Sequence, residues 1–498
     1  MFLLLPMLLH SMREKSSKHN QKGLSMERLG FMDDMVESEL RDAVGRDNVG
    51  TEPDEILAYG TDYFWVARMW MDKGQCPPKG QFIVRPGSTE EVSKVLKIAN
   101  YYKIPVHTWG GGSGSQGGAL PMAGGILLDT KRMDKLIAVD DESSSITAES
   151  GMIFQRLEWY ANEKGKSVMH IPSCLTCGTI GGALGHRGIG ITSTKYGKID
   201  DQCMSMEVVL PNGQIIHTLP VPKHAAGPDL NQIFIGSEGT LGIITKATFR
   251  MVKLPETRLF GAFLFKDFET GLHACRDIVQ LVKPSILRLF DEAETASIIK
   301  DVIGFDQKGA FMNLAVEGRT EITEAEMKIC REVCNKYKAM DCGSEYGEKW
   351  YKNRITFFYP GHIMNNPQMF GTMDTAAPYS KIFSCYQAMK EAAESFNGVR
   401  FIAHCSHWYD WGTMLYDRFI MDTPPEDPKE AILLHNEIWN KVVRAAMAHG
   451  GVLNDHHGVG LKLSRLVKEQ YGPAMAVFEA LKKGLDPNGI MNPYKLGL

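Results

Sequence analysis

Nine residues with the sequence GGGSGSQGG, at positions 110–118, constrain what this chain can fold into more than any other segment. Six of them are glycines and two are serines. Because glycine adopts positive φ angles at little cost, such a loop can turn several main-chain N–H groups toward a single anion. We therefore interpret the segment as a cradle for a phosphate group.

The residues before this loop predict a strand, a helix and a second strand, the order of elements that commonly leads into a phosphate cradle. Phe82–Val84 is typical of a strand, and residues 104–107 are typical of the next one. Between them, Ser88 followed by Glu91 predicts the start of a capped helix. Apolar residues at positions 92, 95, 96 and 99 then recur at helical spacing.

The length of the chain, 498 residues, is too great for one ordinary hydrophobic core. Further strands are predicted at 126–129, 146–149 and 207–210, with a helix near 152–163. We expect a first domain at 26–255 and a second at 256–450, where predicted strands (259–265, 287–290, 311–316) alternate with helices such as 325–337. A last segment covers 451–498. Residues 1–25 are expected to be a disordered extension, because their apolar run is interrupted by Pro6 and is too short to span a bilayer.

The composition narrows the class of function. The formal net charge is −4, and the sequence lacks the basic stripe of a nucleic-acid-binding protein, so we expect a small-molecule partner. The ten cysteines are scattered, and no secretory segment or membrane span is recognised. Free thiols in a reducing cytoplasm are therefore the expectation.

Three further glycine-rich segments accompany the first: PSCLTCGTIGG at 172–182, GHRGIGITSTKYGKIDD at 185–201 and GSEGTLGIIT at 236–245. The last resembles, almost letter for letter, a flavin-contacting segment of the vanillyl-alcohol oxidase family of FAD enzymes. The resemblance is strong over residues 80–255 and weaker over 256–498. It implies an α+β fold: a PCMH-type FAD-binding domain of two α/β subdomains, an α/β cap domain with an antiparallel sheet that holds the substrate, and a C-terminal helical return to the flavin domain.

The resemblance assigns FAD-binding roles to residues of all four segments. The first loop would hold the pyrophosphate, the second and third would lie along the ribityl chain and flavin, and the fourth would reach the adenine side. The residues carried over are Trp109, Gly110, Gly111, Gly112, Ser113 and Gly114 for the pyrophosphate, and Pro172, Thr176, Gly178, Thr179, Gly182, Gly188, Glu238, Gly239 and Ile244 for the rest.

The same resemblance bears on how the flavin is attached. Related enzymes form histidyl links at positions that here hold Ser113 and Met373, so such a link is not expected. Cys177 falls where the berberine-bridge branch bonds a cysteine to the flavin. A small buried thiol is the alternative interpretation, and it favours non-covalent FAD.

Candidate catalytic groups come from the C-terminal part. Residues 454–460, NDHHGVG, resemble the histidine-rich segment of alkylglycerone-phosphate synthases and the equivalent one of D-2-hydroxyacid dehydrogenases. Two adjacent imidazoles on a loop suit proton transfer near neutral pH, so His456 and His457 are the candidate general bases. Tyr416 matches a tyrosine near the flavin in the first of these branches.

Two further positions complete the expected site. The segment 350–355 resembles a WxxRxxI piece that places an arginine on a substrate carboxylate. A guanidinium can hold a carboxylate or phosphate through two parallel hydrogen bonds, and we assign Arg354 that role, with a surface ion pair as the alternative. His186 stands where vanillyl-alcohol and eugenol oxidases have an aspartate beside the flavin. Their Tyr-Arg pair for a phenolate has no match around 459–462, which weakens a phenolate-binding function.

A metal site is the less favoured alternative for this part of the chain. Residues 404–416 align loosely with a metal-binding segment of the hydroxyacid dehydrogenases, so His407 and His456 could hold a hard divalent cation. Met414 stands where the second histidine ligand of that segment would be. We therefore expect no metal.

The resemblance as a whole implies an FAD-dependent oxidoreductase. We expect it to oxidise a small hydroxyl-bearing substrate, a 2-hydroxy acid or an aromatic or benzylic alcohol, by hydride transfer to flavin N5. Oxygen, a quinone or a redox protein would reoxidise the flavin, and the protein would form a homodimer or a larger homo-oligomer. The alternative is a flavin-dependent transferase like alkylglycerone-phosphate synthase, which performs no net oxidation.

Overall fold

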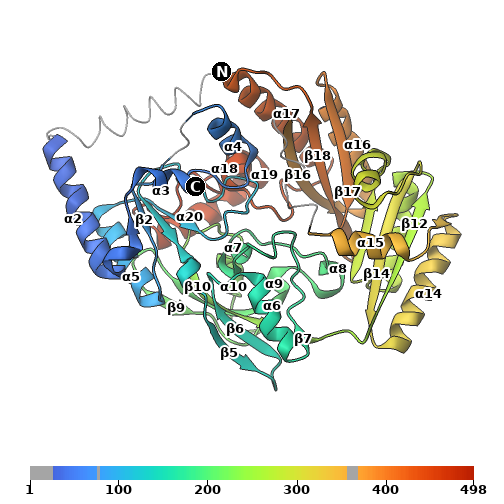
Figure 1. Cartoon of the computed structure of the whole chain (residues 1–498), viewed down its shortest axis with the longest axis horizontal. Coiled ribbons are helices and arrows are strands. Elements are labelled where there is room, and N and C mark those ends of the chain that lie inside the picture. The colour runs from blue at the N-terminus through green and yellow to red at the C-terminus, as the bar shows by residue number, and fades with distance from the viewer. Residues whose placement is uncertain (1–25, 76–78, 356–367) are drawn as a thin grey trace.

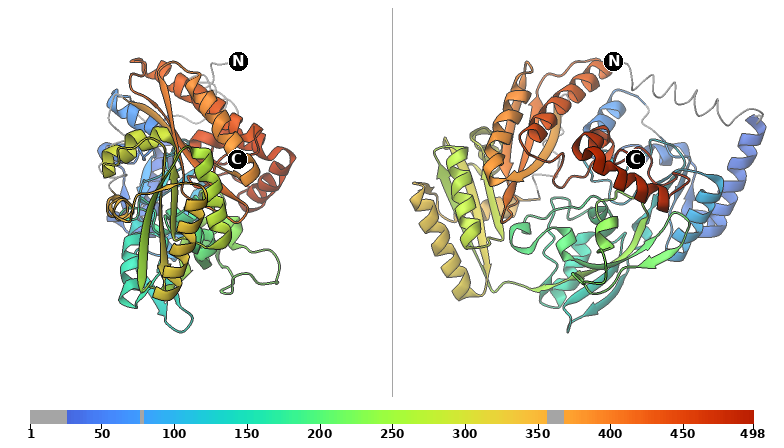
Figure 2. Two further views of the ribbon diagram at one scale, coloured as in Figure 1. Left: turned by 90° about the vertical axis from the view of Figure 1, so that its right-hand side faces the viewer. Right: turned by 180° about the vertical axis from the view of Figure 1, so that it is seen from behind.

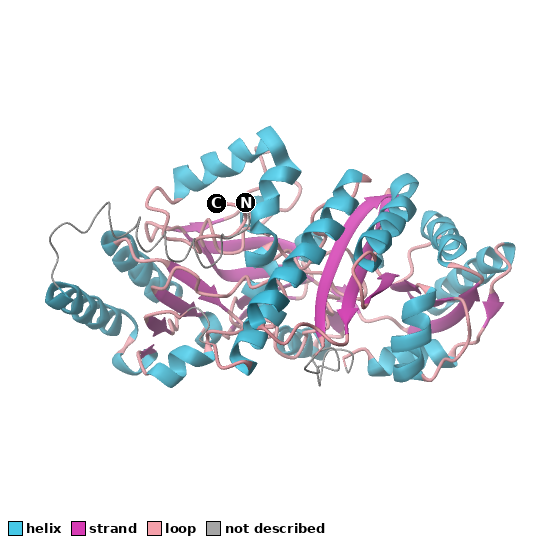
Figure 3. Ribbon diagram, turned by 90° about the horizontal axis from the view of Figure 1, so that it is seen from above, coloured by secondary structure: helices cyan, strands magenta, loops and turns pink. Residues whose placement is uncertain are grey.

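The computed structural model describes residues 26–75, 79–355 and 368–498. The extension expected at 1–25 lies outside the described residues. The strands form two groups along the long axis of the molecule, one built mainly from the first half of the chain and one from the second (Figure 1). Figure 3 shows the same separation from above, with helices packed around both groups.

The first sheet positions the glycine loop. Its strand order is β1-β2-β4-β3, with β1 (Val49–Gly50), β2 (Phe82–Val84), β4 (Ile126–Asp129) and β3 (Val106–Trp109). Helix α5 (Thr89–Tyr102) connects β2 to β3, as the sequence predicts, and the Ser88 side chain accepts a hydrogen bond from the Glu91 N–H at 3.3 Å. The two strands are not neighbours, however, because β4 pairs in parallel with both and lies between them. The glycine loop thus leaves the edge strand β3.

The second sheet is antiparallel and has the order β5-β6-β10-β8-β9. It consists of β5 (Leu136–Asp140), β6 (Ser145–Glu149), β10 (Ile243–Arg250), β8 (Cys203–Val209) and β9 (Ile215–His217). A tight turn follows residue 210: the Gly213 N–H donates to the Leu210 carbonyl oxygen, and Gly213 has a φ of +82°. A small ladder joins β7 (Lys166–Ser167) to β11 (Val252–Lys253).

The third sheet has seven strands, all paired antiparallel, in the order β15-β12-β14-β13-β17-β18-β16. The antiparallel cap sheet implied by the family resemblance is therefore confirmed. The strands are β12 (Thr257–Phe265), β13 (Ile286–Phe290), β14 (Ala310–Gly318), β15 (Met340–Asp341), β16 (Met369–Pro378), β17 (Val399–Cys405) and β18 (Gly412–Met421). The sequence did not predict β16, because its side chains do not alternate between apolar and polar.

Helices cover the sheets and connect the regions. In the first half they are α2 (Met26–Val44), α3 (Pro53–Ala58), α4 (Trp65–Asp72), α6 (Phe154–Glu163), α7 (Ile180–Gly185), α8 (Ser193–Tyr196), α9 (Ile199–Gln202) and α10 (Asn231–Phe234). In the second half they are α11 (Phe268–Leu281), α12 (Glu292–Glu294), α13 (Lys300–Ile303), α14 (Thr320–Lys336), α15 (Glu345–Asn353), α16 (Tyr379–Glu394) and α17 (Pro428–Ala448). Among the described helices, none has the length and apolarity needed to cross a bilayer.

The end of the chain returns to the first sheet. Helices α18 (Gly460–Leu463), α19 (Val467–Tyr471) and α20 (Met475–Leu485) lie between the helices of the cap and the N-terminal region (Figure 2, right). Beyond them, Val106 of β3 exchanges main-chain hydrogen bonds of 2.8 Å with Ile490 and Asn492. The fully buried Lys495 ammonium donates to the carbonyl oxygens of Gly117 (2.7 Å) and Leu120 (3.3 Å). The tail thus holds the glycine loop from behind.

Replacing this lysine tests the contribution of the tail. Lys495→Met keeps the length of the side chain but leaves two loop carbonyls without their donor, which should cost about 2 kcal/mol of unfolding free energy. We expect a lower thermal midpoint together with weaker flavin binding, measured by differential scanning fluorimetry and flavin fluorescence. Lys483→Met, at an exposed position of α20, is the control. An unchanged midpoint and unchanged flavin binding in Lys495→Met would contradict this role.

Candidate active site

The glycine loop is locked against the second glycine-rich segment. A Cβ atom at Gly110 would overlap the Thr179 hydroxyl, and one at Gly111 would overlap the carbonyl oxygen of Cys177. Gly112 has a φ of +62°, which favours glycine. At Gly114, by contrast, an added Cβ would meet no atom within 4 Å. The first three glycines therefore allow close backbone packing, whereas Gly114 faces open space.

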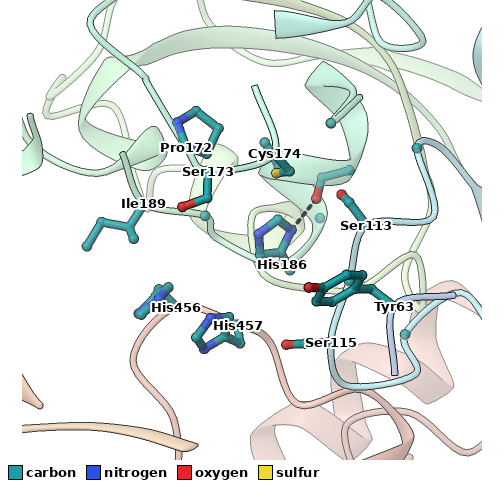
Figure 4. A pocket seen from close by; sticks show the side chains of 18 of the residues that line it. Tyr63, Ser113, Ser115, Pro172, Ser173, Cys174, His186, Ile189, His456 and His457 are labelled. Carbon is teal, nitrogen blue, oxygen red and sulfur yellow. Dashed lines mark hydrogen bonds between the residues drawn. The ribbon is translucent and has the colours of Figure 1, made fainter. Parts of the chain in front are cut away.

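That open space belongs to a cavity between the glycine-rich segments, the seven-stranded sheet and the C-terminal loop (Figure 4). Nearly all residues expected at the site line it, namely Gly110, Gly111, Gly112, Ser113, Gly114, Pro172, Gly178, Thr179, Gly182, His186, Gly188, Glu238, Gly239, Ile244, Arg354, Tyr416, His456 and His457. Trp109, Thr176, Cys177 and His407 are outside the lining.

The two adjacent histidines are oriented by buried carboxylates. Asp374, on β16, accepts hydrogen bonds from the main-chain N–H groups of Asp455 and His456, both at 2.8 Å. His457 Nδ1 donates to Asp374 at 2.7 Å, and His456 Nδ1 donates to Asp455 at 3.2 Å. Because a carboxylate only accepts, Nδ1 of each ring carries a proton, and Nε2 of each ring is the nitrogen left to accept one.

The charges of this group suit that assignment. Burial lowers the pKa of His456 below 6.5, and the neighbouring His457 adds to the effect, so the neutral ring is favoured at neutral pH. Burial alone would raise the pKa of Asp374, but the two imidazoles outweigh it and hold this pKa at about 2. The ring centroids of the two histidines are 4.0 Å apart. Asp374 therefore stays ionised beside them.

His186, the residue that follows α7, lies next to the two histidines (Figure 4). Its Nδ1 donates to the carbonyl oxygen of Gly182 at 2.6 Å. Burial lowers its pKa to about 4, and the charges of His457 and His456 act in the same direction. His186 is thus a neutral ring at neutral pH with Nε2 as an acceptor.

The carboxylate of Glu238, in the fourth glycine-rich segment, binds the protein itself. It accepts hydrogen bonds from the main-chain N–H groups of Val459 and Gly460, the latter at 2.8 Å, and so fixes the loop that carries the two histidines. Burial raises the pKa of Glu238 to about 7, although these two hydrogen bonds act in the opposite direction. The main-chain carbonyl of Glu238 accepts from Asn492 at 2.6 Å.

The sequence did not reveal the wall that the seven-stranded sheet contributes. Arg288 on β13, His404 on β17 and Arg418 on β18 all line the cavity together with Tyr416. Tyr416 and Arg418 are two residues apart and therefore share a face of the sheet. The only signal for these residues is a charged side chain inside an otherwise apolar strand, a pattern that does not say toward which neighbour the side chain points.

Arg354 lies at the C-terminal end of α15, where its guanidinium is 4.0 Å from the centre of the Tyr351 ring. Its Nη1 donates to the Tyr351 carbonyl oxygen at 2.6 Å, whereas its Nε is buried without a hydrogen-bond partner. No carboxylate of the described residues pairs with it. The geometry therefore favours a role for Arg354 in the cavity over the alternative of a surface ion pair.

A second observation, independent of the glycines, indicates that the cavity fits FAD. Several buried polar atoms that line it have no hydrogen-bond partner among the described residues: Thr108 Oγ1, Gln116 Oε1, Ser150 Oγ, and both ring nitrogens of His170. Buried polar groups are normally paired, so these atoms require a polar ligand. His170, fully buried against Phe154 with a pKa lowered by burial to about 3, was not foreseen from the sequence.

The cysteine that lines the cavity is Cys174 (Figure 4). Burial raises the pKa of its thiol to about 11, so the thiol is protonated and a poor nucleophile at neutral pH. The nine cysteines of the described residues are all free thiols.

Asp374, His456 and His457 could also be arranged around a metal ion, since one ligand atom from each lies within 4.8 Å of the others. In the structure His457 Nδ1 donates to Asp374, and His456 Nδ1 donates to Asp455. His407, the other ligand considered, is buried, and its Nδ1 interacts with the Ser193 hydroxyl.

Comparison with known proteins identifies the family. Residues 80–219 match the FAD binding domain family, and residues 254–496 match the C-terminal domain of FAD linked oxidases. Over 494 aligned residues the chain is 30% identical to the uncharacterized FAD-linked oxidoreductase YgcU of Escherichia coli, covering 94% of this chain and 98% of the relative. The chain belongs to the FAD-linked oxidase family.

This chain is also 27% identical to the glycolate oxidase subunit GlcD of Bacillus subtilis, over 83% of this chain and 88% of that protein. Among solved structures, an alkyldihydroxyacetonephosphate synthase matches with a TM-score of 0.77 at 24% identity, covering 93% of this chain and 85% of the other. The structure of p-cresol methylhydroxylase matches with a TM-score of 0.75 at 19% identity, covering 96% and 98%. These matches confirm the PCMH-type fold.

The open space at Gly114 gives a test of where FAD binds in this protein. Gly114→Ala leaves the packing of the loop unchanged but inserts a methyl group into the cavity, so it should weaken FAD binding about tenfold at an unchanged thermal midpoint of the apoprotein. Fluorescence titration of apoprotein with FAD measures this. Gly484→Ala, where an added Cβ also meets nothing, is the control. Equal FAD affinity in both variants would show that FAD lies elsewhere.

Proposed function

We propose that this FAD-linked oxidase oxidises the hydroxyl-bearing carbon of a small substrate, a 2-hydroxy acid or an aromatic or benzylic alcohol. The observation that carries the proposal is the pair of histidines held by Asp374 at the cavity, opposite the glycine-rich segments. Bound FAD supplies the hydride acceptor, its N5. The similarity to a glycolate oxidase subunit supports the hydroxy-acid class.

In the proposed mechanism, Nε2 of His456 or His457 takes the proton of the substrate hydroxyl as the hydride leaves the carbon that bears this hydroxyl. Asp374, ionised and fully buried, stabilises the imidazolium that forms. Tyr416 stands 5.1 Å from the His457 ring, between centroids, and would help to position the hydroxyl. Arg354 would bind a polar or anionic end of the substrate through its unpartnered edge.

We propose that FAD is held without a covalent bond. The support is that the thiol lining the cavity, Cys174, is protonated at neutral pH, and that Cys177 is outside the lining.

A second candidate function is a flavin-dependent transferase without net oxidation. The structural similarity to an alkyldihydroxyacetonephosphate synthase and the arrangement of Tyr416 next to the two histidines favour it. The two functions differ in one measurable respect: under anaerobic conditions an oxidised substrate bleaches the flavin absorbance, whereas a transferase substrate leaves the net redox state unchanged.

Replacing a candidate base tests the mechanism. In His457→Gln the ring that donates to Asp374 is lost, and the rate of anaerobic flavin bleaching by the substrate found in a screen of hydroxy acids and alcohols should fall about 10²- to 10⁴-fold. Stopped-flow absorbance measures that rate. His273→Gln, exposed on α11, is the control. If His457→Gln and His456→Gln both keep the wild-type rate, neither imidazole is the base.

The pH dependence follows from the burial of His456. Its pKa lies below 6.5 in the folded protein, and the neutral ring is the active form, so kcat/KM should stay high at pH 6.5 and fall only at lower pH. Asp374 raises this pKa, so Asp374→Asn should move the acidic limb to still lower pH while it reduces kcat. A pH profile of both proteins measures the shift, with Asp306→Asn, in a surface ion pair, as control. A limb that moves to higher pH would be inconsistent with this assignment.

A further inference from the structure

We propose that Arg288 and Arg418 form the binding site for an oxyanion of the substrate, a carboxylate or a phosphate, on the cavity face of the seven-stranded sheet. The inference rests on the proposed function, since it places this anion beside the candidate bases. It adds two guanidinium groups to Arg354.

The two arginines come from strands on either side of β17. Arg288 lies in the middle of β13, and Arg418 lies on β18, two residues beyond Tyr416. Neighbouring strands are about 4.8 Å apart, so the two backbones are separated by about 10 Å and long side chains from both can reach one ligand. Both residues line the cavity.

A neutral histidine links Arg288 to the carboxylate of Glu294. His404 Nδ1 donates to Glu294 at 2.9 Å, and Arg288 Nη1 donates to His404 Nε2 at 3.3 Å. Burial lowers the pKa of His404, and this effect outweighs the opposite effect of Glu294. The ring therefore carries one proton, on Nδ1, and connects the guanidinium to the carboxylate without adding a charge. This chain fixes one edge of the Arg288 guanidinium.

One nitrogen of each guanidinium group is left to bind a ligand. The Nε atoms of Arg288 and Arg418 are buried and have no hydrogen-bond partner among the described residues. Burial lowers the pKa of Arg288 to about 10, so it is still charged at neutral pH. Both positive charges interact with the same carboxylate, that of Glu294. A buried charge without a counter-ion is costly, and an anionic ligand would supply the missing partner.

The position of the pair relative to the candidate bases narrows the substrate. The guanidinium carbon of Arg418 lies 5.0 Å from the centre of the Tyr416 ring, and the His457 ring lies 5.1 Å from the same centre. The anion site and the proton acceptor thus flank one side chain. A substrate that spans them carries its oxyanion close to the reacting hydroxyl, as a 2-hydroxy acid does.

Titration of the FAD-loaded enzyme with non-oxidisable anions tests the inference. Oxalate represents a carboxylate and inorganic phosphate a phosphate group, and the change in flavin absorbance on binding gives each dissociation constant. The variants are Arg288→Gln, Arg418→Gln and the charge-conserving Arg418→Lys. The control is Arg400→Gln, on the same sheet but paired with Asp422 at the surface.

We expect at least one of the two anions to bind the wild type, and its dissociation constant to rise at least tenfold in each glutamine variant. Arg418→Lys should lose less affinity, and Arg400→Gln none. The anion that shows this pattern identifies the chemical class. Equal affinities in the wild type and both glutamine variants would overturn the inference, as would a wild type that binds neither anion.

The outcome is separable from that of the proposed function. Anion binding that depends on both arginines, without flavin bleaching by any hydroxy acid, would support the site and reject the oxidation. If Arg418→Gln fails to retain FAD, Arg418→Lys takes its place in the titration. Wild-type affinity for both anions in Arg288→Gln and in Arg418→Lys would then reject the site.

Discussion

The buried carboxylate of Glu238 joins the two halves of the active site. It belongs to the fourth glycine-rich segment, yet both of its oxygens accept hydrogen bonds from main-chain N–H groups of the loop that follows His457. Because those two donors have fixed positions in the loop, the loop can adopt only one placement relative to the glycine-rich segments. Asp374, on β16, binds the same loop through the main-chain N–H groups of Asp455 and His456, so the loop is held from both the glycine-rich segment and the cap sheet.

Much of the nucleotide-binding half could be predicted because its information is local. Ser88 and Glu91 define the beginning of a helix within four residues, and the glycines of the first loop permit a backbone path that other residues would block. Family resemblance added the identity of the cofactor. The order of β2, β4 and β3 was not accessible in this way, because the insertion of β4 depends on pairing between segments far apart in the chain.

The substrate wall could not be predicted for a related reason. Whether Arg288 faces the cavity together with Arg418 depends on the register between β13 and β17, two paired strands more than a hundred residues apart in the chain, as Phe290 and His404 are. A shift of one residue would turn both arginines away. Asp374 escaped notice too, since it lies in a strand without alternating polarity and gains its partners from residues 454–457. Cys174 lines the cavity in place of Cys177, a distinction that motif matching cannot make.

The attachment of the tail to the glycine loop has a consequence for biosynthesis. Asn492 and Lys495 supply hydrogen bonds to Gly118, Gly117 and Leu120, and Asn492 also holds His107 on the strand that leads into the loop. While the chain is still being translated, the earlier residues can form their sheets, but the loop lacks these anchors. The phosphate cradle is therefore complete only once residues that lie 374 to 378 positions further along the chain have folded against it.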